Sequence, residues 1–230
     1  GISFHDRAEM LERILTEHPE IEVVQIQFNY LDYDDPTVQS RECYEVCRKF
    51  GKPVLVMEPV KGGSLVKLPE AAQAVLDGLH GGSPASYALR FAAGFPGIAM
   101  VLSGMSSMEQ MRDNLSFMTD FRPLNEREEA AVKQVQEIFR GMHLIPCTAC
   151  RYCTEGCPKH ISIPNLFAAM NAMKLYPTWN AAFYYNSVHT APGRRASDCI
   201  RCGVCEKACP QHLPIRKLLE DVAQEFEKKA

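Results

Sequence analysis

Two short runs of cysteine constrain this chain more than any other feature. Eight of the ten cysteines lie in these runs. The first run is Cys147-x2-Cys150-x2-Cys153-x3-Cys157-Pro158, and the second repeats its spacing 52 residues later, from Cys199 through Cys202, Cys205 and Cys209 to Pro210. The likeness continues into the following residues, Pro-Lys-His-Ile and Pro-Gln-His-Leu. The chain therefore contains an internal repeat of one ligand-binding unit.

Three kinds of site compete to explain four thiols within eleven residues. Disulfides need an oxidising compartment, and cysteines this close would form strained or scrambled pairs. Structural zinc usually takes its ligands as separated pairs around a tetrahedral ion, whereas each run here supplies four thiols alone. In two-cluster iron–sulfur proteins, three closely spaced thiolates bind one cluster and a fourth, before proline, reaches the other. The spacing therefore favours iron–sulfur clusters over zinc and disulfides.

The runs resemble those of bacterial two-cluster ferredoxins, and the resemblance implies two [4Fe–4S] clusters. The crossover typical of that pattern assigns the first cluster to Cys147, Cys150, Cys153 and Cys209. The second cluster takes the complementary set, Cys199, Cys202, Cys205 and Cys157.

Residues 141–230 carry 11 basic and 7 acidic side chains. Two oxidised clusters with their thiolates would add about −4, so we expect the basic residues to compensate cluster charge, with docking of a redox partner protein as the alternative. His160 and His212 recur three residues after a ligand cysteine, either as donors near cluster sulfur or as structural residues at a helix start. Helical patterns from Pro164 and over 213–229 predict a helical ferredoxin domain.

Residues 1–140 alternate between strand and helix patterns. Apolar and β-branched runs predict strands over 22–29, 54–57 and 98–102. Helices are predicted over 8–17, 37–50, 84–93, 107–118 and 126–139, the last capped by Asn125. This alternation favours a parallel sheet with helices outside it. Cys43 and Cys47 lie four residues apart on one predicted helix, and we expect them to be buried small apolar residues, not ligands.

Chemistry in such folds sits at the carboxyl ends of the strands. One of these ends is the glycine turn 58–63, and another is the small-residue loop 103–106, which leads directly into a helix. The free N–H groups of a helix N-terminus attract phosphate. A pair of glycines alone is weak support, because ordinary turns need glycine too. The two loops together indicate a phosphate site, with plain turns as the alternative.

Four segments of this half resemble the last four strand–loop signatures of aldo–keto reductases. They are Gly1-Ile2-Ser3, Val24-Gln25-Ile26, Glu58-Pro59-Val60-Lys61-Gly62-Gly63, and Ser103-Gly104-Met105 through Asn114. A bacterial branch of that family carries a C-terminal 4Fe-4S ferredoxin module of the type Pro146-Cys147-Thr148-Ala149-Cys150-Arg151-Tyr152-Cys153. The resemblance implies an α/β fold. Its last four βα units of a partial (β/α)8 TIM-type barrel would occupy residues 1–140, and the helical two-cluster ferredoxin domain residues 141–230.

The resemblance also implies a nicotinamide cofactor, NADP or NAD. Ser3 and Gln25 would sit at the nicotinamide carboxamide, and Gly62 and Gly63 along the pyrophosphate. The adenosine-phosphate end would be lined by Ser103, Gly104, Gln110 and Asn114. Three residues depart from the family's usual asparagine, stacking aromatic ring and arginine, and they weaken the expectation of NADPH preference: Phe4, Met57 and Gln110.

The family's catalytic tyrosine, lysine, aspartate and histidine lie on its earlier strands. No position in this sequence matches them, so no catalytic residue is assigned. A complete barrel takes about 250 residues, and four parallel strands alone leave open sheet edges that invite pairing. We therefore expect the C-terminal portion of a longer reductase, completed by an N-terminal half, or else an association of two copies.

These observations predict an iron–sulfur oxidoreductase. The alternative is an electron-transfer or assembly module in which the barrel segment is a scaffold and the clusters are partly structural. Hydride carries two electrons and a [4Fe–4S] cluster accepts one, so a converter such as flavin is not excluded. The net charge of −3 argues against nucleic-acid binding, and no apolar stretch reaches the roughly 20 residues of a membrane span. A cytoplasmic location is expected.

Overall fold

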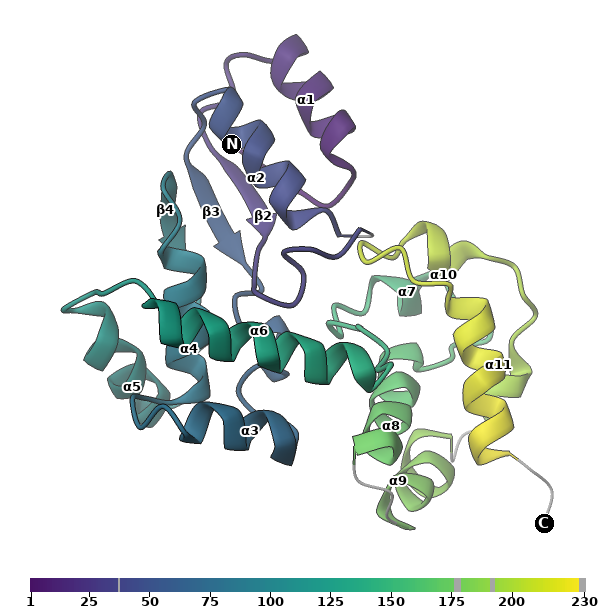
Figure 1. Ribbon diagram of the computed structural model, residues 1–230. Coiled ribbons are helices and arrows are strands. Elements are labelled where there is room, and N and C mark those ends of the chain that lie inside the picture. Colours follow the sequence, from purple (N-terminus) through teal and green to yellow (C-terminus); the bar gives the residue numbers. More distant parts are fainter. Residues whose placement is uncertain (37, 176–178, 191–192, 228–230) are drawn as a thin grey trace. The chain divides into compact units, whose positions relative to one another are not determined.

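The computed structural model describes the chain except residues 37, 176–178, 191–192 and 228–230 (Figure 1). It divides into two compact units, Gly1–Gly141 and Met142–Ala230. Within the part of the chain that the structure describes, every helix is too short or too polar to traverse a lipid bilayer.

The first unit is built on a four-stranded parallel sheet in the order β1-β2-β3-β4 (Figure 1). Its strands are β1 (Ile2–Phe4), β2 (Val24–Gln27), β3 (Val54–Met57) and β4 (Ile98–Val101). Parallel neighbours need crossover connections, which helices α1 (Ala8–Glu17) and α2 (Ser40–Lys49) supply. The register places Ser3 beside Gln25 and Gln27 beside Met57. The α/β class predicted from the sequence is confirmed.

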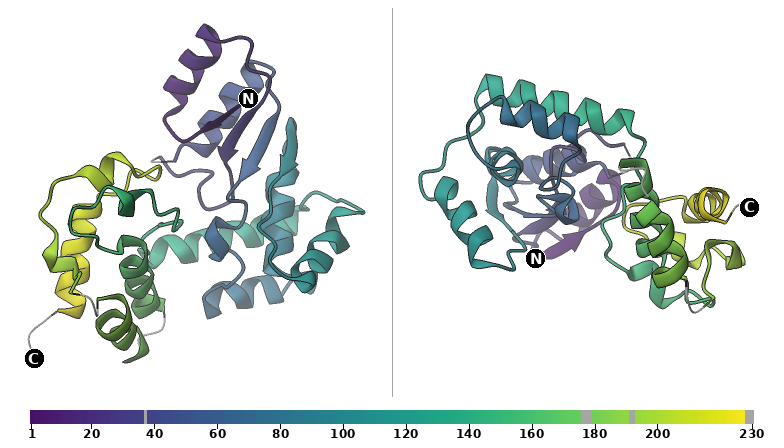
Figure 2. Two further views of the ribbon diagram at one scale, coloured as in Figure 1. Left: turned by 180° about the vertical axis from the view of Figure 1, so that it is seen from behind. Right: turned by 90° about the horizontal axis from the view of Figure 1, so that it is seen from below.

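One face of the sheet is covered by α1 and α2, as the two further views show (Figure 2). Val54 and Val56, two residues apart on β3, are both fully buried there, as the two-residue period of a strand requires. Cys43 and Cys47 pack into the same core, and burial raises the pKa of each thiol to about 12. Their prediction as buried apolar residues is confirmed.

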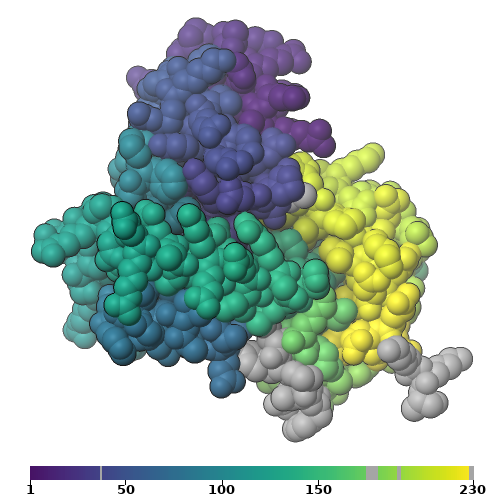
Figure 3. All heavy atoms as spheres, in the orientation of Figure 1, coloured from purple at the N-terminus to yellow at the C-terminus, as the bar shows by residue number. Residues whose placement is uncertain are grey.

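Four more helices follow in the first unit, and three of them enclose a second core. These are α3 (Glu70–Asp77), α4 (Pro84–Ala93), α5 (Met108–Met118) and α6 (Glu126–Gly141), of which α3, α4 and α6 surround the buried side chains of Tyr30, Leu76 and Val135. Figure 3 shows the teal surface of α6 beside the blue surface of α3. Asn125 caps α6 as predicted, because its Oδ1 accepts from the N–H groups of Arg127 and Glu128, both at 3.0 Å.

Several elements differ from the predictions in their bounds, and one helix was missed. The strand predicted over 22–29 ends at Gln27, because the Asn29 side chain folds the chain into a turn by accepting from the N–H groups of Leu31 and Asp32. The helix predicted over 37–50 begins at Ser40, and residue 37 lies outside the described residues. Helix α3 was not predicted.

The second unit is helical and repeats its own architecture. Its elements are α7 (Tyr152–Glu155), α8 (Ile163–Leu175), α9 (Trp179–Phe183), η2 (Tyr184–His189), η3 (Ala196–Asp198), α10 (Val204–Lys207) and α11 (Ile215–Phe226). The pair α10 and α11 follows α7 and α8 at the 52-residue offset of the cysteine runs. The core between them includes Leu166, Phe167, Leu219 and Val222. The helix predicted over 213–229 ends at Phe226, and residues 228–230 lie outside the described residues.

Candidate functional site

The internal repeat of the second unit extends to its backbone. Three pairs of residues at the 52-residue offset adopt the same left-handed conformation: Ala149 and Arg201 (φ 58° and 60°), Arg151 and Gly203 (φ 70° and 78°), and His160 and His212 (φ 52° and 49°). Most residues other than glycine avoid this region. Such turns direct successive N–H groups into one concavity, as anion and iron–sulfur sites require.

His160 and His212 lie in the turn that ends each run. Their N–H groups donate to the carbonyl oxygens of Cys157 (2.9 Å) and Cys209 (3.1 Å). Both residues are exposed. The backbone of both histidines therefore takes part in the turn before the following helix.

The first three cysteines of one run match those of the other in exposure. The second cysteine of each run, Cys150 or Cys202, is exposed, whereas the third, Cys153 or Cys205, is buried at 7% exposure. Burial raises the pKa of Cys153 to about 12 and that of Cys205 to about 11. Because burial disfavours a bare thiolate, these thiols would ionise only beside a bound metal centre whose positive charge stabilises the sulfur.

The cysteines group across the two runs. Cys157 of the first run lines a cavity with three cysteines of the second run, Cys199, Cys202 and Cys205. Cys209 of the second run lies near Cys150 and Cys153 of the first, close enough for the charges of these groups to act on one another. The N–H of Arg201 points at Cys199 Sγ from 3.4 Å. The structure thus brings each fourth cysteine to the opposite run.

A mononuclear metal site would draw its ligands close together, since Zn–S bonds are about 2.3 Å long. Among the described residues, no three His, Cys, Asp or Glu side chains are grouped in this way. A cube differs, because each thiolate binds a separate iron and the sulfur atoms surround the cluster at its corners. The preference for a cube over a zinc ion rests on the spacing of the cysteines in the two runs.

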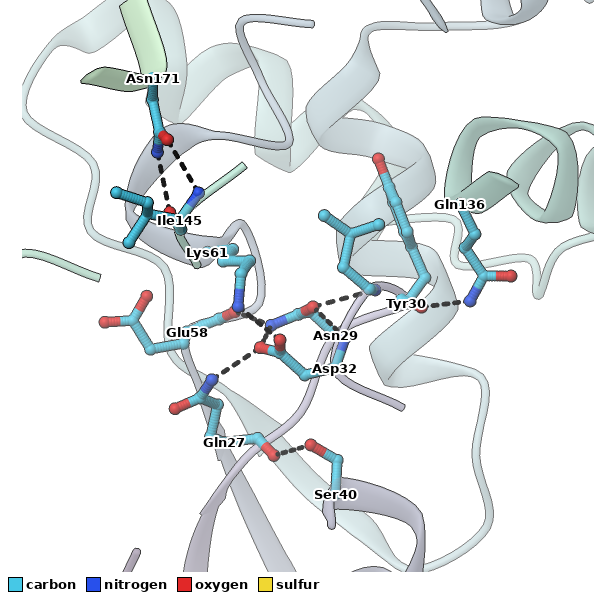
Figure 4. Close-up of polar contacts among 11 residues, drawn as sticks. Gln27, Asn29, Tyr30, Asp32, Ser40, Glu58, Lys61, Gln136, Ile145 and Asn171 are labelled. Carbon is cyan, nitrogen blue, oxygen red and sulfur yellow. Dashed lines mark hydrogen bonds and ion pairs between the residues drawn. The ribbon is translucent and has the colours of Figure 1, made fainter. Parts of the chain in front are cut away.

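The segment before the first run is fixed by helix α8. Asn171 donates to the Ile145 carbonyl oxygen and accepts from the Ile145 N–H, both at 2.8 Å (Figure 4). This two-point contact, two residues before Cys147, sets the direction in which the chain enters the cysteine run.

In the first unit, a cavity of about 740 Å³ opens at the carboxyl ends of β3 and β4. It is lined by six of the eight residues predicted to bind a nucleotide: Gly62, Gly63, Ser103, Gly104, Gln110 and Asn114. The other two, Ser3 and Gln25, are neighbours on β1 and β2, where Gln25 Nε2 lies 3.5 Å from Met57 Sδ. The volume is in the range of small-molecule sites.

Hydrogen bonds order the side of this cavity that is formed by the loop after β4 and by α5. Asn114 Nδ2 donates to Ser103 Oγ at 2.9 Å, and the Ser106 N–H donates to Gln110 Oε1 at 2.7 Å. Ser83 Oγ donates to the Asp113 carboxylate at 2.6 Å. The first two contacts tie the loop after β4 to α5, and the third ties α5 to the residue before α4.

The charged residues on the cavity wall are Glu58, Lys67 and Asp113. Burial raises the pKa of Glu58, although the Gly62 N–H and the charge of Lys61 act in the opposite direction. Glu58 Oε2 is buried without a hydrogen-bond partner among the described residues. This wall is less basic than a site for several phosphates usually is.

A buried polar cluster behind the glycine turn was not predicted. Figure 4 shows Gln27, Asn29 and Lys61 converging on the carboxylate of Asp32, which is 1% exposed. Asp32 and Lys61 lie 29 residues apart, so neither indicates the other in the sequence. The sequence signal that could have found this cluster is that Asp32 and Lys61 each follow the end of a strand, β2 and β3.

Two comparisons bear on this chain. Residues 1–137 match the family model of the Aldo/keto reductase family, and residues 146–213 match that of the 4Fe-4S dicluster domain. The comparison with curated proteins gives no match. The reductase model spans more than half of the 230 residues. The chain therefore belongs to the aldo/keto reductase family and carries a ferredoxin-type 4Fe-4S domain after its reductase segment.

Proposed function

We propose that this protein is an oxidoreductase that combines a nicotinamide-nucleotide site in the first unit with two [4Fe–4S] clusters in the second. The observation that carries the proposal is the grouping of cysteines across the two runs, with Cys157 beside Cys199, Cys202 and Cys205. This grouping is the one that the dicluster spacing requires.

Each cluster would be held by three cysteines of one run and the last of the other. One set is Cys147, Cys150, Cys153 and Cys209, and the other is Cys199, Cys202, Cys205 and Cys157. Bound clusters would supply one-electron transfer. The exposed Cys150 and Cys202 mark the sides from which a redox partner protein would exchange electrons.

The nucleotide site would extend from β1 to α5. The backbone of Gly62 and Gly63 would approach the pyrophosphate, as glycine allows. Ser103, Gly104, Gln110 and Asn114 would form the adenosine-phosphate end of the same cavity. Ser3 and Gln25 would hydrogen-bond the nicotinamide carboxamide. With Lys67 as the cation on a wall that also bears Glu58 and Asp113, NAD is as suitable a ligand as NADP.

Coupling between the two units raises a question of electron counting. A hydride carries two electrons, and each cluster accepts one. Electrons from the nucleotide would therefore reach the clusters through a converter such as flavin, which accepts the hydride and passes its electrons on one at a time. The alternative function is an electron-transfer or assembly module, in which the first unit is a scaffold.

The four-stranded sheet has the form of an incomplete barrel. Among the described residues, β1 pairs with β2 and β4 pairs with β3, so both outer strands keep an unpaired edge. An eight-stranded barrel closes such edges. We propose that the four βα units are the last four of a barrel whose other half comes from an N-terminal portion of the reductase, which would bring the catalytic residues, or from a second copy.

The test uses the anaerobically prepared protein. NADPH or NADH should bind in the first unit. With flavin added as a converter, the bound nucleotide should reduce the clusters and change their visible absorption. Gln25→Ala should weaken nucleotide affinity about tenfold, the value of one or two hydrogen bonds. Gln73→Ala is a matched control, because Gln73 bonds Asp77 on the surface of α3. Reversible reduction by dithionite without any nucleotide binding would favour the alternative module.

A further inference from the structure

The buried cluster around Asp32 joins the loop after β2 to the turn after β3. Asp32 Oδ2 accepts from Gln27 Nε2 and from Asn29 Nδ2, both at 2.6 Å. Asp32 Oδ1 accepts from Lys61 Nζ. The side chains of Asp32 and Lys61 are 2% and 7% exposed. A buried charge needs such a set of partners, and here the lysine and the aspartate satisfy each other.

The turn that Lys61 belongs to is conformationally strained. Two residues other than glycine, Glu58 (φ 57°) and Lys61 (φ 46°), adopt the left-handed conformation, followed by Gly62 (φ 60°) and Gly63 (φ 94°). Such residues persist only where the surroundings hold them. Asn29 Nδ2 donates to the Glu58 carbonyl oxygen at 2.9 Å, and Lys61 is held by Asp32. The loop after β2 therefore holds both strained positions.

The two sides of the turn face different surroundings. Val60 and Gly62 line the 740 Å³ cavity together with Gly63. The Lys61 side chain points the other way, into the buried cluster, as Figure 4 shows. A lysine beside a glycine turn suggests a direct phosphate contact, but the geometry of Lys61 opposes that role.

We infer that Asp32 and Lys61 act as a positioning pair. Their ion pair, together with Asn29, sets the backbone of Gly62 and Gly63 in the orientation that the proposed nucleotide site uses. Neither charged side chain contacts the ligand. This inference rests on the proposed nucleotide site, and it adds that ligand affinity depends on a buried contact behind the turn.

A structural role and a positioning role are separable by a double substitution. Either single variant, Asp32→Asn or Lys61→Met, leaves one buried charge unpaired and lowers stability. The double variant Asp32→Asn with Lys61→Met removes both charges and restores most of the stability. The ion pair that ties Asp32 to Lys61 is still lost, so a positioning role predicts that the affinity is not restored.

The experiment measures NAD⁺ affinity and hydrogen exchange of the 58–67 amides in wild type and in the double variant. We expect an unfolding midpoint near that of wild type, affinity at least about tenfold weaker through misaligned hydrogen bonds, and faster exchange in the turn without ligand. Lys52→Met is the control, because the ammonium group of the half-buried Lys52 donates to the Pro19 carbonyl oxygen and not to a carboxylate.

The outcomes separate the two claims. Wild-type affinity and unchanged exchange in the double variant would overturn the positioning pair and leave the nucleotide site intact. Wild-type protein that binds neither NAD⁺ nor NADPH would overturn the proposed nucleotide site and, with it, the effect on affinity. In that case the exchange of the 58–67 amides still decides whether the pair orders the turn.

Discussion

Cys157 belongs to the first cysteine run but lies beside Cys205 of the second run, where the two thiols line one cavity. The turn after α7 produces this crossing, because the Cys157 N–H bonds back to the Thr154 carbonyl oxygen at 3.2 Å. The Cys209 N–H bonds the Glu206 carbonyl oxygen at 3.3 Å in the equivalent turn. Each turn carries its last cysteine away from its own run.

The crossover makes a prediction about pairs of cysteine variants. Cys157→Ala with Cys205→Ala removes two ligands of one cluster, so about four irons per chain should remain. Cys157→Ala with Cys153→Ala removes a ligand from each cluster, so iron should be almost completely lost. Anaerobic iron quantification measures both values. Cys43→Ala, which alters a buried thiol outside the runs, should retain the wild-type content. The opposite pattern in the two double variants would contradict the crossover.

Because Glu58 lies on the cavity wall and can change its charge, we expect nucleotide affinity to depend on pH. Burial raises the pKa of Glu58, so its carboxyl becomes ionised at a higher pH in the folded protein than in an unfolded chain. The charged form repels a pyrophosphate, so NAD⁺ affinity should fall as pH rises. Asp32 also raises this pKa, whereas Lys61 and the Gly62 N–H lower it.

The matched variants for this prediction are Glu58→Gln and Glu70→Gln. Glu58→Gln should bind NAD⁺ more tightly than wild type at about pH 8 and lose the pH dependence, whereas Glu70, exposed at the start of α3, should change neither. Titrations between about pH 5 and 8 measure this. Parallel profiles of wild type and Glu58→Gln would show that Glu58 does not face the bound phosphates.

The contact between α4 and α6 predicts acid sensitivity. Arg90 donates to both carboxylate oxygens of Glu128 at 2.8 Å. Burial alone would raise the pKa of Glu128, but the bonds from Arg90 and the Asn125 N–H outweigh it, and the pKa is lowered. A lowered pKa gives stability above the ordinary value near 4.3, which is lost as pH falls through the folded-state pKa.

Glu128→Gln should therefore destabilise α4 and α6 at pH 7 by about 1.5 kcal/mol, as expected for a partly exposed charge-assisted hydrogen bond. Hydrogen exchange of the α4 and α6 amides measures this segment alone. The difference from wild type should shrink below about pH 4. A difference that stays constant down to that pH would mean that the effect comes from packing and not from charge.

Two buried tyrosines should respond in opposite directions to loss of the hydroxyl. Tyr30 is fully buried, and its hydroxyl has no partner among the described residues, so burial raises its pKa. Tyr30→Phe should keep or raise stability by up to about 1 kcal/mol. The Tyr185 hydroxyl donates to Glu227 and accepts from the Ala196 N–H at 3.1 Å. Tyr185→Phe should lower stability by about 1 to 3 kcal/mol. Urea denaturation that ranks the two variants the other way would contradict this.

The regular elements could be predicted because their signals are local. Helices 8–17 and 84–93 agree with the structure, since each has an apolar face and a defined start, with Pro84 preceded by the Ser83 cap. Helix α3 was missed although Pro69 and Glu70 are common at a helix start. Its eight residues are too few for a helical period of apolar residues to stand out.

The cysteine pattern also predicted that the two runs share one backbone conformation. A spacing repeated after 52 residues requires a repeated backbone, and the matching left-handed pairs such as Ala149 and Arg201 have that form. The Asp32–Lys61 contact could not be predicted in this way. It depends on the register that places Gln27 beside Met57 and on a strained turn, and both are set by tertiary structure.

The most direct test of the account is iron and sulfide quantification of the anaerobically prepared full chain. Two [4Fe–4S] clusters predict about eight irons and about eight inorganic sulfides per chain, with a visible absorption that dithionite bleaches. A colourless protein that holds zinc and lacks sulfide would contradict the account.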